Sequence, residues 1–318
     1  MKLIIQIPCF NEEDTLADTI NDLPKSIDGI DEIEYLIIND GSTDNTVEVA
    51  RECGVDHIVS YKTNRGLALA FSAGIDACLR LGADIIVNTD ADNQYCGADI
   101  EKLIEPILSG QAEIVIGERP IDSIEHFSAQ KKRFQRIGSR VVRFASGTDI
   151  PDAPSGFRAY ARDAAMRINV INEYTYTLET IIQAGMKKMT IASVPIRTNP
   201  QTRESRLFKN MWSYIVRSTN VILRSIIMYR PLKFFVLIGG VIGVIGLVFV
   251  IRYIVIAIID TPEGHIQSLV LSAMMIMVGM QFIVSGLQAD MISANRKILE
   301  DVQYKIRKKY YSEDDASE

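Results

Sequence analysis

The first two hundred residues alternate short apolar runs with longer amphipathic stretches, and this alternation restricts the possible folds more than any other feature. The apolar runs are continuous, which indicates strands buried on both faces of a sheet. They are LIIQI, EYLII, HIVSY, DIIVNT and EIVIG. Helical patterns cover 12–23, 45–53, 66–80 and 99–109. Strand–helix alternation predicts an α/β fold of the Rossmann-like type, with a mostly parallel sheet between two layers of helices.

Three polar motifs follow predicted strands, at the carboxyl ends where such sheets bind ligands. They are IPCFNEE, NDGSTDN and TDADNQ. In the last motif, Asp90 and Asp92 lie two residues apart, so both carboxylates can face one site if the backbone is extended. Gln94 adds a third oxygen on the same side, and this set of hard ligands suits Mg²⁺ or Mn²⁺ bound together with substrate phosphates. The alternative is a turn in which the aspartates only accept hydrogen bonds from nearby amides.

The motif NDGSTDN indicates a tight turn after a buried strand. Gly41 permits an unusual backbone angle there, and Asp40 ends the strand pointing into the crevice, where it can accept hydrogen bonds from a base. The alternative role for this motif is to cap the next helix. Asn45, with Glu48 three residues on, is expected at that helix start, whereas Asp40 lies too early for it.

Two stretches without charged residues, 234–251 and 266–289, mark the C-terminal part of the chain. Each can span or nearly span the ~30 Å hydrocarbon core of a bilayer as a helix. They predict a two-helix transmembrane hairpin, with two buried core helices as the alternative. Lys and Arg residues flank the hairpin but are absent from its connecting turn, IDTPEGH. Arg252, near the far end of the first span, is the one exception, and its side chain can reach the outer interface. This distribution predicts a multi-pass protein with its N-terminal α/β domain and both chain ends in the cytoplasm.

Residues 204–230 place apolar side chains near helical spacing, with basic and polar residues opposite them. A basic amphipathic helix that leads into a span is expected to lie in the membrane interface; an ordinary packed helix is the alternative. The predicted organisation is an N-terminal α/β domain, interfacial helices, two transmembrane helices, and a cytoplasmic helix with an acidic tail. Their predicted ranges are 1–205, 206–231, 232–289 and 290–318.

Composition adds weaker restrictions. The net charge of −6 argues against nucleic acid as a partner. The four cysteines have no CxxC or zinc-like spacing, so unpaired thiols on a cytoplasmic domain are expected. The N-terminal stretch MKLIIQIPCF turns polar too soon for a signal peptide.

Read together, IPCFNEE, IINDGSTDNT, NRGLALAFSAG and NTDADNQ resemble the family 2 glycosyltransferases with the GT-A fold, in their order and spacing. DAPSGFRAY resembles the D-x-x-SGFRA stretch of the polyprenyl-phosphate branch, which includes dolichyl-phosphate mannose synthases and undecaprenyl-phosphate glucosyl and aminoarabinosyl transferases. TRESRLF resembles the acceptor loop of that branch. The resemblance covers about residues 3–210, and the two-span tail matches one subgroup.

The resemblance implies roles for individual residues. Nucleotide binding falls to Pro8, Asn11, Glu12, Asp40 and Asp90. Metal binding, of Mg²⁺ or Mn²⁺, falls to Asp90, Asp92 and Gln94. The residues implied in catalysis are Asp92, Asp152, Arg203 and Arg206. Ser155 lines the acceptor site, and Arg203 and Arg206 close over phosphate. Whether Asp152 orients the acceptor or acts as a base is left open.

The chain also departs from the family pattern. Tyr95-Cys96-Gly97 stands where many relatives have His-Pro-Pro, and Asn39 replaces the first aspartate of the usual Asp-Asp pair. Pro151 stands where mannose synthases can carry an arginine. The candidates to supply that charge to the acceptor phosphate are Arg133, Arg136 and Arg140.

The implied reaction is an inverting sugar transfer from a nucleotide-diphospho-sugar to a polyprenyl phosphate at the inner membrane, with a UDP-sugar favoured and GDP-mannose next. Alternatives are another acceptor, such as a protein, a diacylglycerol or a growing polysaccharide, and a non-catalytic membrane scaffold. A processive synthase is disfavoured because its Gln-x-x-Arg-Trp motif is absent and Trp212, the single tryptophan, lies in FKNMW. The spacing Gly239-x-x-x-Gly243 indicates helix packing, within the hairpin or in a homo-oligomer.

Overall fold

The computed structural model describes residues 1–120, 139, 142–143, 146–171, 175–200, 211–259 and 266–314. The chain divides into two compact units. The first comprises Met1–Ile222 together with Tyr304–Glu318, and the second comprises Leu223–Gln303.

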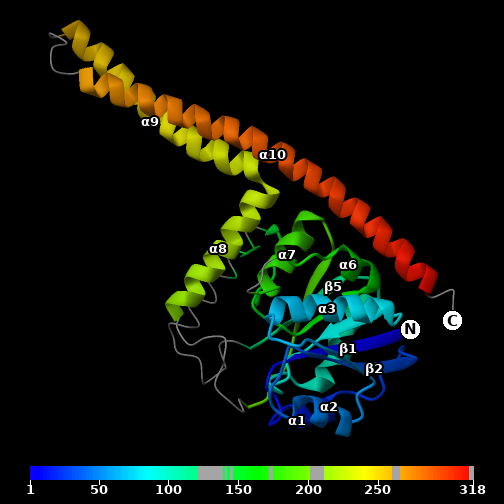
Figure 1. Ribbon diagram of the computed structural model, residues 1–318. Coiled ribbons are helices and arrows are strands. Elements are labelled where there is room, and N and C mark those ends of the chain that lie inside the picture. The colour runs from blue at the N-terminus through cyan, green and yellow to red at the C-terminus, as the bar shows by residue number, and fades with distance from the viewer. Residues whose placement is uncertain are drawn as a thin grey trace. The chain divides into compact units, whose positions relative to one another are not determined.

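A seven-stranded mixed sheet forms the centre of the first unit (Figure 1), with the strand order β3-β2-β1-β4-β6-β5-β7. Its strands are β1 (Lys2–Cys9), β2 (Glu32–Asn39), β3 (His57–Ser60), β4 (Ile85–Asn88), β5 (Ile114–Glu118), β6 (Arg158–Ala161) and β7 (Ile191–Pro195). The first five confirm the predicted strands. β6 runs antiparallel to β4 and β5, and the other pairs are parallel. The predicted mostly parallel α/β sheet is therefore confirmed, with two strands that were not predicted.

The helices of this unit follow the predicted alternation. They are α1 (Leu16–Asp22), α2 (Thr46–Glu52), α3 (Leu67–Arg80), α4 (Ile100–Leu108), α6 (Arg162–Arg167) and α7 (Thr177–Met186), with a short 3₁₀ turn, η1 (Gly97–Asp99), before α4. Asn45 occupies the predicted cap position of α2, but its side chain makes no capping hydrogen bond. Instead, the Thr46 N–H donates to Asp44 Oδ1 at 3.1 Å.

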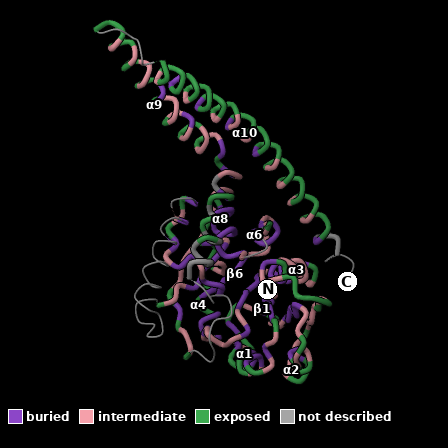
Figure 2. Tube along the Cα trace, turned by 60° about the vertical axis from the view of Figure 1, so that its left-hand side comes forward, coloured by how far each residue is buried: buried purple, intermediate pink, exposed green. Residues whose placement is uncertain are grey.

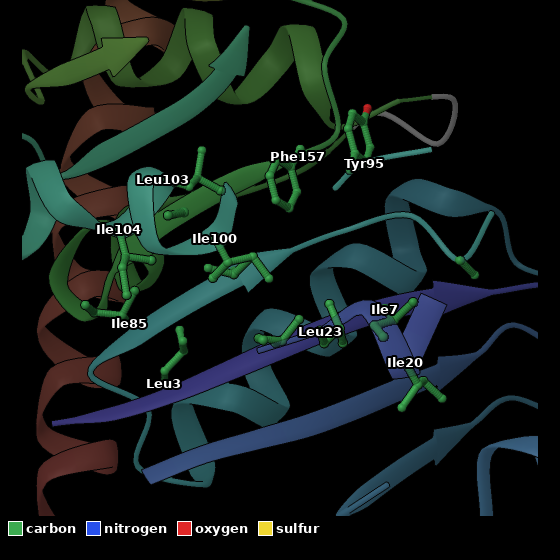
Figure 3. Packing of buried hydrophobic residues seen from close by; sticks show 14 of the residues in the cluster. Leu3, Ile7, Ile20, Leu23, Ile85, Tyr95, Ile100, Leu103, Ile104 and Phe157 are labelled. Carbon is green, nitrogen blue, oxygen red and sulfur yellow. The ribbon is translucent and has the colours of Figure 1, made fainter. Parts of the chain in front are cut away.

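Both faces of the sheet are covered, which explains the continuous apolar runs. On one face, Leu3 and Ile7 of β1 belong to a buried cluster with Ile20 of α1 and Leu103 of α4 (Figure 3). On the other face, α3 packs against β1 and β2. Gly74 of α3 lies so close to the sheet that a Cβ there would be 2.2 Å from Gln6 Oε1. β1 is therefore buried on both sides, and its inward-facing Gln6 is a polar exception.

Three long C-terminal helices follow along the chain, α8 (Met211–Tyr229), α9 (Pro231–Ile259) and α10 (Ile266–Asp314). The second unit contains the end of α8, all of α9 and most of α10. Two of them, α9 and α10, are long and apolar enough to cross a membrane. Most residues of α9 and α10 are exposed or only partly buried (Figure 2), with Ile258 exposed by 78% and Met277 by 71%. Within this chain they are therefore not the buried core helices of the alternative interpretation.

Small residues bring α9 and α10 together. A Cβ added to Gly239 would lie 2.5 Å from the Gly279 carbonyl oxygen, and one added to Gly279 would lie 2.6 Å from the Gly239 oxygen. Gly243 takes part through its backbone nitrogen, 2.9 Å from the added Gly279 Cβ. The glycine spacing thus serves packing within the hairpin, the first of its two predicted uses.

The last turns of α10 belong to the first unit. Arg307 donates to the carbonyl oxygens of Met166, in the last turn of α6, and of Ile168, just beyond its end, at 3.2 and 3.1 Å. Tyr311 is 3% exposed, and its backbone oxygen accepts a hydrogen bond from Arg162 at 3.1 Å. Because α10 is continuous from Ile266 to Asp314, the boundary expected near residue 290 is not a break in the helix.

Candidate active site

Loops from three strands are tied together at the carboxyl edge of the sheet. The Thr15 hydroxyl donates to the Ala91 oxygen at 2.8 Å, and the Thr19 hydroxyl donates to the same oxygen at 3.0 Å. The Glu12 N–H donates to Thr46 Oγ1 at 2.8 Å. The three polar motifs predicted to meet at this edge therefore do so.

The turn after β2 places Asp40 against the loop that precedes α3. Its two carboxylate oxygens accept the N–H groups of Arg65 and Gly66, each at 2.8 Å. A carboxylate offers about four lone-pair sites, so these bonds leave acceptor capacity for a ligand. Gly41 has a φ of 73°, and a Cβ there would lie 2.5 Å from the Thr63 carbonyl carbon. The predicted need for glycine at this turn is confirmed.

Two asparagines hold the same turn from its other side. Asn11 has a φ of 56°, and its Oδ1 accepts the Thr43 N–H at 2.8 Å. Asn39 Oδ1 accepts the Ser42 N–H at 2.9 Å. The Asn39 side chain, which stands where the family has an aspartate, thus uses its amide oxygen to hold this turn. Pro8 lies one residue before the end of β1, at the start of this loop.

The Asp-x-Asp loop gathers negative charge. Burial, followed by the charge of Asp92 and a smaller contribution from Glu12, raises the pKa of Asp90 to about 7, although Arg119 acts in the opposite direction. The loop is shaped by Asn93, whose φ is 54°, and by a hydrogen bond of 3.3 Å from the Gln94 N–H to Asp92 Oδ1. Carboxylates that repel each other in this way favour a divalent cation between them.

The donor set fits a cation that is shared with a ligand. Across the described part of the chain, no group of three or more His, Cys, Asp or Glu side chains is arranged to hold a metal. Asp90 and Asp92, with Gln94 beside them, provide an incomplete set of hard oxygen ligands. Mg²⁺ typically binds to one or two carboxylates and completes its coordination with phosphates and water.

A buried arginine braces the segment between Asp152 and β6. Arg158 is fully buried and donates to the backbone oxygens of Ser155, Ala153 and Thr177 at 2.7, 2.7 and 2.9 Å. It also donates to Thr180 Oγ1 at 2.7 Å. These four hydrogen bonds from the Arg158 guanidinium hold the loop in its conformation. By contrast, Ser155 Oγ is buried with no hydrogen-bond partner among the described residues.

Asp152 is also fully buried, and it is paired with Arg119. The Arg119 Nε donates to Asp152 Oδ2 at 2.7 Å, and Nη2 donates to Oδ1 at 2.9 Å. Arg119 also acts electrostatically on Asp90, so this pair borders the Asp-x-Asp loop. Sequence reasoning missed Arg119, although its position directly after β5 was a usable signal. Mannose synthases can carry an arginine at the position of Pro151, and Arg119 is a further candidate, besides Arg133, Arg136 and Arg140, to supply that positive charge.

The remaining predicted site residues lie outside the described part of the chain. They are Arg133, Arg136, Arg140, Arg203 and Arg206. The described residues therefore unite the predicted nucleotide turn, the Asp-x-Asp loop and the 152–155 segment at one edge of the sheet.

Known proteins share this sequence and this fold. Residues 4–168 match Glycosyl transferase family 2. The chain is 30% identical over 252 residues to the UDP-N-acetylglucosamine–dolichyl-phosphate N-acetylglucosaminyltransferase of Methanococcus voltae, with 71% of this chain and 93% of that protein covered. It is 24% identical over 317 residues to the undecaprenyl-phosphate 4-deoxy-4-formamido-L-arabinose transferase of Yersinia pestis, which covers 96% of this chain and 91% of that protein.

Among solved structures, the chain is similar to glucosyl-3-phosphoglycerate synthase from Mycobacterium tuberculosis in complex with Mn²⁺, UDP and glucosyl-3-phosphoglycerate. The TM-score is 0.53 at 18% identity, over 71% of this chain and 78% of that one. At this identity the likeness establishes the GT-A fold. The sequence match, the fold and the Asp-x-Asp site agree, and the chain is a glycosyltransferase that belongs to glycosyl transferase family 2.

Proposed function

We propose that this glycosyltransferase moves a sugar from a nucleoside-diphosphate sugar to a membrane polyprenyl phosphate, with inversion at the anomeric carbon. The two relatives described above are named for dolichyl-phosphate and undecaprenyl-phosphate acceptors, and both extend over most of this chain. The observation that carries the proposal is the Arg119–Asp152 pair beside Asp90. It places a guanidinium that can bind an anionic acceptor next to the carboxylates that serve the donor.

On the donor side, Asp40 accepts hydrogen bonds from the base, and Pro8, Asn11 and Glu12 form the turn around the nucleotide. Asp90, Asp92 and Gln94 are the residues that would hold Mg²⁺ or Mn²⁺. Such an ion, when bound, neutralises the charge that develops on the departing nucleoside diphosphate. The raised pKa of Asp90, which results from burial and from the nearby charges of Asp92 and Glu12, supports this assignment.

On the acceptor side, Arg119 binds the lipid phosphate. A guanidinium has five N–H donors, and the two-point pair with Asp152 uses two of them. The other three N–H donors can bind phosphate oxygens, because the planar guanidinium matches the geometry of such anions. Ser155, whose buried hydroxyl has no partner among the described residues, adds a donor. Arg133, Arg136, Arg203 and Arg206 remain predicted contributors.

The reaction needs positioning more than deprotonation. A phosphate oxygen of the acceptor is already ionised at neutral pH. It forms a bond to the anomeric carbon as the bond from that carbon to the diphosphate oxygen breaks, and the electron pair leaves with the nucleoside diphosphate. We therefore assign to Asp152 the role of holding Arg119 in place rather than that of a base, because both its oxygens accept from Arg119.

The C-terminal helices suit a lipid acceptor. α9 and α10 are long and apolar enough to cross a membrane, and the Lys and Arg residues lie outside the connecting turn. The positive-inside rule then puts the catalytic unit and both chain ends on the cytoplasmic side of the inner membrane. UDP is the favoured donor nucleotide, followed by GDP, and one relative is named for a UDP-sugar.

The test uses membranes that contain the full chain, undecaprenyl phosphate, Mn²⁺, and a panel of radiolabelled UDP- and GDP-sugars. We expect label in the lipid fraction from one donor, lost in Asp92→Ala and retained in Glu105→Gln, which changes an exposed carboxylate on α4. Nucleotide binding without lipid labelling by any donor would overturn the acceptor assignment. Absence of metal-dependent nucleotide binding would favour the scaffold alternative.

A further inference from the structure

Tyr95 is one of the residues in which this chain departs from the His-Pro-Pro pattern of its family, and it is built into the site. Its ring stacks on Phe157, with the ring centroids 5.0 Å apart and the planes 10° from parallel. Figure 3 shows the two rings side by side, with the Tyr95 hydroxyl at the outer end of the pair. The side chain is 6% exposed, so its hydroxyl must find partners inside the protein.

The first partner is the backbone of the 152–157 segment. The Gly156 N–H donates to the Tyr95 hydroxyl oxygen at 3.1 Å. Burial and the nearby charge of Asp90 raise the pKa of Tyr95, so the hydroxyl keeps its proton. The hydroxyl also lies close enough to Asp90 to lower the pKa of that carboxyl.

Gly156 lies directly against the same carboxylate. A Cβ added to Gly156 would be 3.1 Å from both Asp90 oxygens, closer than most side chains pack. Asp90 therefore packs against a residue without a side chain, and the Tyr95 hydroxyl that accepts the Gly156 N–H lies near the same carboxylate. These three residues join the Asp-x-Asp loop to the loop that carries Asp152 and Ser155.

A second layer keeps Gly156 in place. Asn88 Nδ2 donates to the Gly156 oxygen at 2.9 Å and to the Tyr176 hydroxyl at 2.8 Å, while Gln6 Nε2 donates to Asn88 Oδ1 at 2.9 Å. The Tyr176 ring is stacked on Phe71 with centroids 3.9 Å apart. Gln6, Asn88 and Tyr176 are all fully buried, so these hydrogen bonds hold Gly156, against which Asp90 packs, in a fixed position.

We propose that Tyr95 is a positioning residue of the transferase site, whose hydroxyl fastens Asp90 to Gly156 and so sets the spacing between the Asp-x-Asp loop and the 152–157 loop. This inference rests on the proposed role of Asp90 as a ligand of the divalent cation. Tyr95 orients that ligand without touching either substrate. In this chain it takes the place of the histidine of the family pattern.

The test compares Tyr95→Phe with the unchanged full chain in detergent. Phenylalanine keeps the stacking on Phe157 but removes the hydroxyl. Titration of free Mn²⁺ by electron paramagnetic resonance, with UDP and with GDP, measures metal binding directly. We expect the apparent Mn²⁺ dissociation constant to rise about 10- to 100-fold, the usual range when a residue that orients a metal ligand is lost. The kcat for lipid labelling should fall while the donor KM at saturating Mn²⁺ changes little.

Two further variants separate orientation from folding. Tyr35 lies on β2, and its hydroxyl donates to the Pro24 oxygen at 3.1 Å. Tyr35→Phe removes this hydroxyl and should leave Mn²⁺ binding unchanged. Tyr95→His restores a ring that can donate a hydrogen bond, and it should recover part of the lost Mn²⁺ affinity.

The proposal is overturned if Tyr95→Phe binds Mn²⁺ as the unchanged chain does, or if its only effect is a lower unfolding temperature. It is also overturned if the unchanged chain binds no Mn²⁺ with either nucleotide. Mn²⁺ binding that depends on Tyr95, without lipid labelling, would support this inference while contradicting the proposed acceptor.

Discussion

Arg119 and Asp152 meet in a two-point ion pair at 2.7 and 2.9 Å. Asp152 is fully buried and Arg119 is only 15% exposed, so this pair is largely removed from water. A planar fork of donors matches a carboxylate in a way that a single ammonium group does not. The pair therefore fixes the direction of the Arg119 guanidinium at the edge of the Asp-x-Asp loop.

Arg119→Lys tests this arrangement. Lysine keeps the charge but loses the two-point geometry, so we expect the rate of lipid labelling to fall at least about tenfold, because one bidentate contact contributes more than ~1.4 kcal/mol. Mn²⁺-dependent nucleotide binding should stay within twofold of the original. Arg119→Ala should also lower the free energy of unfolding by about 3–5 kcal/mol, because it leaves Asp152 buried without its partner. Unchanged labelling by Arg119→Lys would contradict the assigned role.

Asp99 provides a prediction about pH. Burial alone would raise its pKa, but hydrogen bonds from Arg197 and Lys102 outweigh burial and hold the pKa at about 2. An unfolded chain has an aspartate pKa of about 3.9. The folded pKa is lower, so this stabilisation is present above about pH 4 and is lost as pH falls toward 2. Because Arg197 is 62% exposed, solvent screening reduces the effect.

The measurement is chemical unfolding of the detergent-purified chain at several pH values. Asp99→Asn should be less stable than the original at pH 7, and the difference should shrink between about pH 4 and pH 2. Glu105→Gln on α4, the helix that follows Asp99, is the control, and its stability should match the original at every pH. A difference that stays constant down to pH 2 would show that the charge of Asp99 is not the cause.

Arg307 should hold the end of α10 on the catalytic unit. Its guanidinium donates to two carbonyl oxygens near the end of α6 and to Asn169 Oδ1. Arg307→Ala removes all three bonds, so the nearby Tyr311, which is 3% exposed, should become accessible. We expect several-fold faster chymotrypsin cleavage after Tyr311. Lys297→Ala, at an exposed position of the same helix, should not change the rate, and equal rates for both variants would contradict the prediction.

Gly239 and its neighbour Gly240 offer a matched pair in the hairpin. A Cβ at Gly239 would meet the Gly279 oxygen at 2.5 Å, whereas one at Gly240 meets nothing within 4 Å. Gly239→Val should therefore force α9 away from α10 and destabilise the hairpin by about 1–3 kcal/mol, the usual cost of overpacking. Thermal unfolding in detergent measures this, and Gly240→Val should match the original. Equal effects of both substitutions would rule out the close approach.

The predictable part of the fold was the part with local, repeated patterns. Strands β1 to β5 are apolar runs covered on both faces, and their hydrophobicity marks them without knowledge of their neighbours. β6 was missed because its four residues begin with the charged Arg158, whose burial depends on four acceptors supplied by Ala153, Ser155 and α7. β7 was missed because its side chains are only partly buried, which leaves little hydrophobic pattern.

The same division holds for the site. Asp40, Asp90 and Asp92 follow predicted strands, and the parallel order of β1, β2 and β4 brings their ends to one edge. Arg119 and Tyr95 escaped prediction as site residues because their partners, Asp152 and Gly156, are distant in sequence. Only the pairing of β5 and β4 with the antiparallel β6 brings these segments together.

By itself the sequence determined the strand–helix alternation, the carboxylates of the Asp-x-Asp motif and the two apolar helices, because each depends on the periodicity or chemistry of neighbouring residues. The tertiary structure alone decided which cation faces Asp152, what supports Asp90 and where the end of α10 docks. Those choices depend on contacts across the sheet and between distant helices, whose geometry no local pattern encodes.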